Sequence, residues 1–192
     1  GNTLMRECLI EMSTKDNNPD HLLLDAVLAV FRDETLDPAF RALMIRPPIQ
    51  IEIAAQISDR GLQVDPKRIY EAQDRFAKAV AHHLGTDLSE IYARHQITVA
   101  YKPDATQSSS RSLANATLNY ISHLDGGETA MRQYALTNNM TQQFAALGNL
   151  LRIGMGQAEL AAFYEQWRSE RLVIDKWFGV QIANAKPADL IQ

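Results

Sequence analysis

The stretch DPKRIYEAQDRFAKAVAHHLG, residues 65–85, decides the fold class of this chain. Asp65 is a preferred helix N-cap, and Pro66 suits the first helical position because no backbone N–H is needed there. The apolar side chains that follow recur at helical spacing and share one face: Ile69, Ala72, Phe76, Val80 and Leu84. Gly85 then ends the pattern. The stretch predicts a long amphipathic helix with one buried face.

Similar start and stop signals lie on both sides of this helix. Pro19 opens a run of helical periodicity that continues through Phe31. Asp37-Pro38 repeats the N-cap and proline signal, and that helix must end by Arg46 because Pro47-Pro48 cannot continue it. Thr86 or Asp87 restarts a short helix after Gly85. The first residues are also helical in period, with Leu4, Cys8 and Met12 on one predicted stripe.

The second half of the chain shows the same kind of helix start and stop signals. Ser108–Ser110 are expected to precede a helix, and Asp125-Gly126-Gly127 breaks it. Thr141 is expected to cap a later helix, and the last helix is predicted from about Leu172 to Asn184. The predicted stripe of the first of these helices is Leu113, Thr117, Tyr120, Ile121 and Leu124.

Two segments have an ambiguous pattern. Residues 49–53 alternate as Ile-Gln-Ile-Glu-Ile, which is typical of a half-buried strand. We favour a helix there because Ala54, Ala55 and Ile57 continue a helical stripe from Ile53. Residues 97–101, ITVAY, are rich in β-formers, and we expect an extended loop because no partner strand is evident.

These elements predict an all-α fold of about ten short-to-medium helices. Short connections between successive helices favour stacked antiparallel helical hairpins, which together form an irregular α-solenoid or superhelical domain. No fixed-period repeat is visible, which disfavours a regular repeat family. We expect a single helical domain over residues 1–192.

Composition excludes several classes of function. The chain has 192 residues and a net charge of −4, and it has no basic patch of the kind that binds nucleic acid. No apolar run approaches the roughly 20 residues of a membrane helix. The start lacks the pattern of a signal peptide. Cys8 is the single cysteine, so no internal disulfide can form, which fits a cytoplasmic protein. Its apolar neighbours indicate a buried, unreactive thiol.

The histidines show no metal-binding pattern. The five are His21, His82, His83, His95 and His123, and none belongs to a His-Glu-x-x-His motif. His82 and His83 are adjacent, so on a helix their side chains point about 100° apart and cannot form an i, i+4 ligand pair.

Other polar and aromatic features have simpler structural explanations. We interpret Gly154-Met155-Gly156 as an inter-helix turn, because the third glycine and the preceding strand of a dinucleotide site are absent. A serine among Ser108–Ser110 is expected to cap a helix. Asp33-Glu34 is expected to serve turn and cap roles. Trp167 and Trp177 are expected to form inter-helix core rather than a ligand platform.

Five blocks of sequence resemble the aminopeptidase N family. One is WRSERLVIDKWF at 167–178, which contains both tryptophans of the chain. The others are FRDETLDPA at 31–39, EIY at 90–92, RSLANA at 111–116 and NNMT at 138–141, all in family order. The residues before about Asp20 match poorly. Gly154-Met155-Gly156 lacks the Glu-Asn that would complete the family's amine-binding motif Gly-x-Met-Glu-Asn.

The resemblance implies the first part of a helical C-terminal domain in a larger zinc-dependent aminopeptidase. In that family, two histidines and a glutamate of a separate catalytic domain hold zinc, and a second glutamate activates water. The helical domain encloses the active-site cavity and limits the entry of large peptides. The expected partners are therefore the catalytic domain of the same polypeptide and the peptide substrates of that enzyme.

We expect no catalytic, cofactor-binding or metal residue in this chain, and zinc only in the parent enzyme. Gly1 is interpreted as a cloning remnant, and the chain as a fragment that self-associates through an apolar face left at its C-terminal end. The alternative from another functional class is a stand-alone helical scaffold that binds protein partners.

Overall fold

A computed structural model describes residues 2–97, 99–137 and 139–185. Within these ranges the chain forms eleven helices and no strand. It divides into two compact units, residues 1–120 and residues 121–192. The all-α prediction is confirmed, with one helix more than the ten expected. The prediction of a single domain over residues 1–192 stays a prediction.

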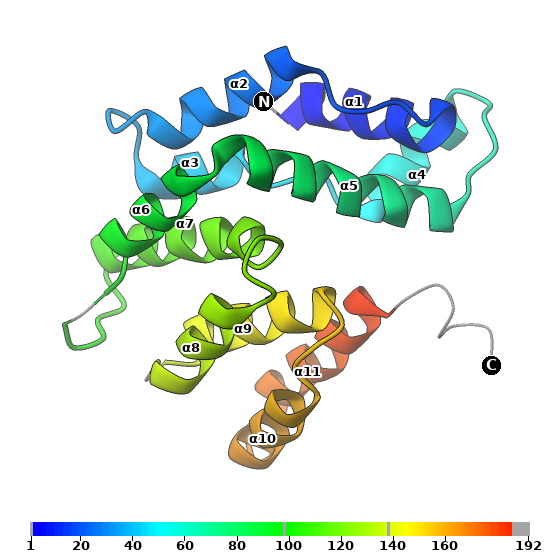
Figure 1. The fold of residues 1–192 in the computed structure, drawn as a ribbon. Helices are drawn as coiled ribbons and strands as arrows, with labels where there is room; N and C mark the ends of the chain where they lie inside the picture. Colours follow the sequence, from blue (N-terminus) through cyan, green and yellow to red (C-terminus); the bar gives the residue numbers. More distant parts are fainter. Residues whose placement is uncertain (1, 98, 138, 186–192) are drawn as a thin grey trace. The chain divides into compact units, whose positions relative to one another are not determined.

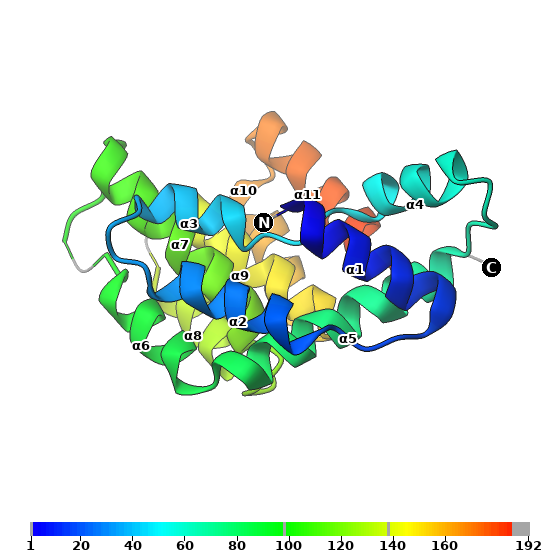
Figure 2. The ribbon, with the colours of Figure 1, turned by 90° about the horizontal axis from the view of Figure 1, so that it is seen from above.

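The first unit contains seven helices, shown in Figures 1 and 2 from blue to green. Their bounds are α1 Asn2–Lys15, α2 His21–Arg32, α3 Pro38–Met44, α4 Gln50–Asp59, α5 Pro66–Leu84, α6 Thr86–Arg94 and α7 Ala105–Ile121.

Helix α5 organises the first unit. This 19-residue helix packs against α1, α2, α4 and α6, and Figure 1 shows α1 and α2 running along it. Asp65 accepts hydrogen bonds from the backbone N–H groups of Lys67 and Arg68, as its N-cap role predicts. All five residues of the predicted apolar face are buried: Ile69, Ala72, Phe76, Val80 and Leu84.

The predicted stripe of α1 is right at Met12, which is buried, and wrong at Leu4, which is 60% exposed. Met5 and Leu9, one residue after Leu4 and Cys8, are buried instead where α1 packs against α4 and α5, and Cys8 is half-buried. A shift of one residue turns a helix by about 100°, so the two choices differ by a quarter turn of the face. Both phases contain apolar side chains, and only the position of the neighbouring helices selects between them.

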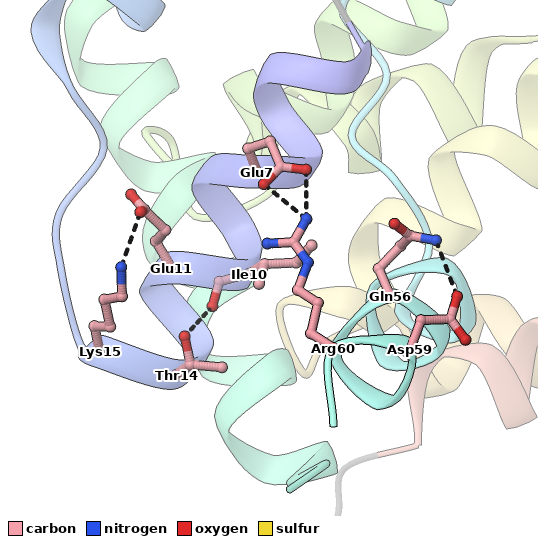
Figure 3. A network of polar contacts seen from close by, with 8 residues as sticks. All are labelled: Glu7, Ile10, Glu11, Thr14, Lys15, Gln56, Asp59 and Arg60. Atoms are coloured by element: carbon pink, nitrogen blue, oxygen red, sulfur yellow. Dashed lines mark hydrogen bonds and ion pairs between the residues drawn. The ribbon is translucent and has the colours of Figure 1, made fainter. Parts of the chain in front are cut away.

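Polar contacts along α1 fix how it meets the end of α4. The guanidinium of Arg60, the residue after α4, lies 2.6 Å from one carboxylate oxygen of Glu7 and 2.8 Å from the other. Figure 3 shows this pair between the two helices, beside the Lys15–Glu11 pair within α1. The hydrogen bond and the charge of Arg60 lower the pKa of Glu7. Both side chains are substantially exposed, so this ion pair adds little to the free energy of folding. We infer that its main role is to orient α1 relative to the end of α4.

Helices α2 and α3 begin close to where the sequence placed them. The N-cap of α2 is Asp20, the residue after Pro19, and its side chain accepts from Leu22 N. Asp37 caps α3 as predicted, with Pro38 as the first helical residue, and the helix ends before Arg46. Short apolar helices that end at prolines need a tertiary anchor, and Tyr120 supplies one by donating to the carbonyl of Ile45 at 2.6 Å.

The two ambiguous segments are resolved differently. Residues 50–59 are helical, and Ile53 and Ile57 form the buried face of α4, which confirms the helix prediction for the Ile49–Ile53 segment. Residues 97 and 99–103 contain neither helix nor strand, and Thr98 lies outside the described residues. Gln107 of α7 holds this loop through the carbonyl of Ala100 and the N–H of Lys102.

The second unit contains four helices: α8 Glu128–Leu136, α9 Met140–Arg152, α10 Gln157–Trp167 and α11 Arg171–Asn184. Helix α9 packs against α8, α10 and α11, and α10 also packs against α11. One cluster of this unit's buried core consists of Leu147, Leu151, Leu160, Phe163 and Val180. The N-cap of α9 is Asn139, whose side chain accepts from Gln142 N, so the prediction of Thr141 as the cap is wrong.

Two glycines allow α8 and α10 to start against the same side chain. Gly127 and Gly156 each have φ +86°, a left-handed conformation that glycine adopts without a Cβ clash. A Cβ on Gly127 would lie 3.0 Å from Leu150 Cδ2, and one on Gly156 would lie 2.8 Å from Leu150 Cβ. Leu150 of α9 therefore sets the position of both helix starts.

Across the residues that the structure describes, no helix is both long enough and apolar enough to cross a bilayer.

Candidate functional site

The adjacent histidines of α5 have different surroundings. His82 is exposed, whereas His83 Nε2 lies 2.8 Å from Asp25 Oδ1 of α2, and the His83 ring centroid is 6.3 Å from that of His21. His83 and Asp25 thus link α2 to α5. Among the residues that the structure describes, no three His, Cys, Asp or Glu side chains are grouped to hold a metal ion. The absence of a metal ligand in this chain stays a prediction.

His95 lies at the end of α6, close to a buried cation. Burial lowers the pKa of His95, and the positive charges of Arg41 and Arg94 lower it further. A neutral imidazole at this position suits a crowded helix junction. His123 lies just after α7 and is partly buried.

The three serines lie inside a helix, not before it. Helix α7 starts at Ala105, and Asp104 accepts from Gln107 N at its beginning, so the prediction of a serine cap is wrong. Ser109 instead bridges two helices. Its hydroxyl accepts from the N–H of Ala39 at 2.9 Å and donates to the Asp37 carboxylate at 3.1 Å. The sequence could not show this because Asp37 and Ser109 are 72 residues apart.

Asp33 and Glu34 each have a polar partner of their own. Asp33 Oδ1 accepts from both the N–H and the hydroxyl of Thr35, and these hydrogen bonds lower the pKa of Asp33. Glu34 forms an ion pair with Arg94 of α6. The two carboxylates have separate partners, which agrees with the turn role expected of this junction.

Gly154-Met155-Gly156 forms the turn between α9 and α10. Met155 N donates to the carbonyl of Leu150 at 2.8 Å, and Gly156 is the N-cap of α10. The turn interpretation is therefore confirmed by the backbone.

Both tryptophans lie between helices. They are partly buried and pack against the core of the second unit, as expected. Trp167 Nε1 donates to Gln143 Oε1 at 3.1 Å, and Trp177 Nε1 donates to the Leu160 carbonyl at 2.9 Å. An indole N–H that is already paired within the fold has little left to offer a ligand. Of the flanking aromatic residues, Phe178 is the more exposed, at 55%.

Two buried arginines are the main polar features that sequence reasoning missed. Arg41 of α3 is 3% exposed and donates to the carbonyl of Phe31, at the end of α2. Arg111 of α7 is 5% exposed, contacts Gln107 Oε1 at 3.0 Å and lies 4.8 Å from the centre of the Tyr101 ring. Within the described residues neither arginine forms an ion pair with a carboxylate, so each is a buried cation held by carbonyl oxygens or a ring.

A weak sequence signal marked one of these arginines. Residues at helical spacing from Arg111 are buried on the same face of α7: Gln107, Ala114, Leu118 and Ile121. A polar residue in phase with an apolar stripe indicates a buried polar contact. Arg41 carries no such signal, because α3 is only seven residues long.

Comparison with known proteins relates the whole chain to one family and to longer enzymes. The family described as "Domain of unknown function (DUF3458_C) ARM repeats" matches residues 1–192. Aminopeptidase N of Caulobacter vibrioides is 28% identical over 194 residues, covering 97% of this chain and 22% of that protein. Aminopeptidase N of Escherichia coli is 30% identical over 177 residues, covering 88% of this chain and 19% of that protein.

A solved structure shows that the fold is shared. The crystal structure of Legionella pneumophila aminopeptidase A in complex with aspartic acid superposes with a TM-score of 0.76 at 22% identity, covering 94% of this chain and 22% of that one. The chain spans about a fifth of the length of these relatives. It belongs to the ARM-repeat family described as DUF3458_C, and the part of aminopeptidase N that it resembles is the C-terminal helical domain.

Proposed function

We propose that this chain is the helical domain of a cytoplasmic zinc aminopeptidase, where it encloses the active-site cavity and limits the entry of large peptides. The observation that carries the proposal is the match of 97% of the chain to an aminopeptidase N at 28% identity. Zinc would supply a Lewis acid and an activated water in the catalytic domain. The described residues of this chain contain no ligand group that fits zinc, so we assign no catalytic step to them.

The fold suits an enclosing wall. ARM-type helices stack into rigid superhelices, because each repeat buries its apolar face against its neighbours. Within each unit polar links join the helices, for example Ser109 with Asp37 in the first and Tyr134 with the Glu159 carbonyl in the second. A rigid wall excludes large substrates by shape and needs no reactive side chain.

The test compares the peptidase activity of the 192-residue chain with that of the full translation product of its gene. The 192-residue chain, incubated with zinc and an alanine p-nitroanilide, should release no product above the buffer rate. The full product should hydrolyse the same substrate, and a chelator should abolish that activity. Zinc-dependent turnover by the purified chain, or a full reading frame without His-Glu-x-x-His, would overturn the proposal.

If this domain limits the entry of large peptides, the full enzyme should also discriminate between substrates by size. Its kcat/KM should fall as peptides with the same N-terminal residue become longer and bulkier, whereas a chromogenic amino acid should be hydrolysed freely. If folded polypeptides were trimmed as fast as short peptides, the enclosing role would be wrong even though the enzyme assignment stood.

The second candidate is a scaffold that binds protein partners. The ARM-repeat description favours it, since such arrays offer extended binding surfaces. A reading frame that begins near residue 1 and encodes no catalytic domain would support the scaffold against the enzyme.

A further inference from the structure

The turn that follows α9 holds a methionine in a fixed position. Met155 N donates to the carbonyl of Leu150 at 2.8 Å, and Gly154 N donates to the carbonyl of Leu151 at 3.0 Å. Gly154 has φ +82°. These two hydrogen bonds and the left-handed glycine form a Schellman motif, in which the residue after the glycine commonly makes an apolar contact with the last turn of the helix. Met155 is that residue here, so its backbone is tied to the end of α9.

The Met155 side chain also reaches the start of α8. Gly127 is the N-cap of α8, and the point where a Cβ on Gly127 would lie is 3.8 Å from Met155 Sδ. The same point is 3.0 Å from Leu150 Cδ2 and 2.7 Å from Ile153 Cδ1. The side chains of Leu150, Ile153 and Met155 therefore form one apolar cluster, which we call the Gly127 cover. It packs the end of α9 against the start of α8.

The Gly127 cover is open to solvent at its methionine. Met155 is 38% exposed, and Met131 of α8 is similar at 37%. The other four methionines of the chain are less accessible: Met5, Met12, Met44 and Met140. A small oxidant reaches exposed thioethers before buried ones. Accessibility thus selects Met131 and Met155, and only the second belongs to the Gly127 cover.

We propose that Met155 is a site of reversible oxidation by hydroperoxides, at which formation of the sulfoxide weakens the packing of the second unit. The thioether sulfur attacks one peroxide oxygen, so that an S–O bond forms and the O–O bond breaks. The sulfur loses two electrons, and the other peroxide oxygen leaves as water or an alcohol with the proton of the transferred hydroxyl. This inference goes beyond the proposed function and does not depend on it.

The sulfoxide should disturb the cover because it is polar. Oxidation turns a flexible apolar side chain into a strong hydrogen-bond acceptor, whereas Leu150 and Ile153 present only apolar groups to it. The hydrogen bond from Met155 N to α9 holds the backbone in place. The new oxygen can therefore reach water only if the side chain leaves the cover. Its departure exposes Leu150 and the start of α8 to solvent.

Peroxide treatment of the 192-residue chain tests the proposal. Cys8→Ala is used throughout, so that no thiol competes for the oxidant. Peptide mass spectrometry measures the sulfoxide at each methionine, and tryptophan fluorescence during urea unfolding reports on the second unit, which contains both tryptophans. Met131 and Met155 should be oxidised at similar rates and well before Met5 and Met12. The urea midpoint should then fall by about 0.5 M or more.

Two leucine variants separate the two exposed methionines. Met131→Leu should lose as much of its urea midpoint on oxidation as the parent, because its Met155 is still oxidised. Met155→Leu keeps an apolar side chain of similar volume and should retain its midpoint after the same treatment. Incubation of the oxidised parent with methionine sulfoxide reductases, one for each epimer, should restore the original midpoint.

The same measurements can overturn the proposal. Equal losses in Met155→Leu and the parent would show that another residue carries the effect. A Met155 that stays reduced while Met131 is fully oxidised would show that its sulfur is shielded. Protection of Met155 in the full translation product, at peroxide concentrations that oxidise it in the 192-residue chain, would show that the longer protein closes the site.

Met155→Gln gives a readout that needs no oxidant. Glutamine has a similar length and a polar end, so it should lower the urea midpoint of the untreated chain toward that of the oxidised parent. Met131→Gln is the matched control and should change the midpoint little. If Met155→Gln were as stable as the parent, a polar group would be tolerated in the Gly127 cover and the proposal would be wrong.

Discussion

Trp177 of α11 donates its indole N–H to the backbone carbonyl of Leu160 in α10, at 2.9 Å. The same ring lies 5.0 Å from the Tyr164 ring, measured between centroids. One side chain thus joins two consecutive helices by a directional bond and by an aromatic contact, which are separable by mutation.

Replacing Trp177 should therefore have two graded effects. Trp177→Phe keeps most of the apolar contact but removes the donor, and we expect a loss of about 1 kcal/mol in the free energy of unfolding. Trp177→Ala also removes the ring, and we expect about 3 kcal/mol, the low end for a buried aromatic because this ring is only partly buried. Urea unfolding followed by circular dichroism measures both. Phe178→Ala removes a ring that is 55% exposed but lies edge-on to Trp177, 4.9 Å away between centroids, so it should cost less than Trp177→Ala.

Asp37 and Ser109 should be energetically coupled. Asp37→Ala removes the N-cap of α3 and should cost about 1–2 kcal/mol. Ser109→Ala removes the bridge from α7 and should cost about 1 kcal/mol. The double variant should lose less than the sum, because the two side chains share hydrogen bonds.

Tryptophan fluorescence and circular dichroism together can show in which unit the stability of these variants is lost. Both tryptophans lie in the second unit, so their fluorescence reports on residues 121–192 alone. Circular dichroism reports on all helices. A strictly additive double-mutant cycle would contradict a functional Asp37–Ser109 bridge.

Arg41 should be more costly to truncate than to replace by an apolar side chain. Burial lowers the pKa of Arg41, so its charge is held in a site that disfavours it. Arg41→Ala removes the donor to the Phe31 carbonyl and leaves a gap, and we expect a loss of about 2–3 kcal/mol. Arg41→Met retains an unbranched chain of similar length without the charge and should recover most of that loss. Equal losses would show that the charge, not the packing, holds this junction.

The helices were predictable from the sequence because they are coded locally. Asp65-Pro66 and Gly85 bound α5, and its apolar spacing leaves one choice of buried face. The buried face of α1 could not be predicted because Leu4 and Met5 belong to two alternative apolar stripes, and only packing against neighbouring helices selects between them. The first residue of α7 was predicted wrongly because Asp104 and the three serines are all residue types that cap helices. Ser109 acts through Asp37, and no local pattern encodes a contact over that distance.

Cys8 should be slow to react. Burial raises the pKa of its thiol to about 11. The reactive form is the thiolate, so at pH 8 only about one thiol in a thousand is ionised, compared with about a quarter for a free thiol near pKa 8.5. Reaction with a disulfide reagent in native buffer should therefore lag far behind the urea-unfolded chain. The structure places Cys8 half-buried rather than fully buried as predicted, and equal rates in the two states would contradict even this partial protection.

The same pKa makes stability depend on alkaline pH. The folded pKa of Cys8 lies above the unfolded one, so its contribution to stability is complete below about pH 8.5. It should be lost as the pH rises toward about 11, because the unfolded chain ionises first. A Cys8→Ala variant should lack this component, and the difference between the two pH profiles of the unfolding free energy measures it.

Gly126 and Gly127 offer a matched pair for separating backbone strain from crowding. Both have a positive φ, +62° and +86°. A Cβ on Gly126 would meet nothing within 4 Å, whereas one on Gly127 would lie 2.7 Å from Ile153 Cδ1. Gly126→Ala should therefore cost only the left-handed conformation, about 1–2 kcal/mol. Gly127→Ala should cost this and, in addition, the displacement of Ile153 and Leu150, for a total of about 3 kcal/mol or more. Tryptophan fluorescence during urea unfolding follows both variants, since both glycines lie in the second unit. If the two variants lost equal stability, the contact of Gly127 with α9 would not be tight, and Leu150 would not set the start of α8.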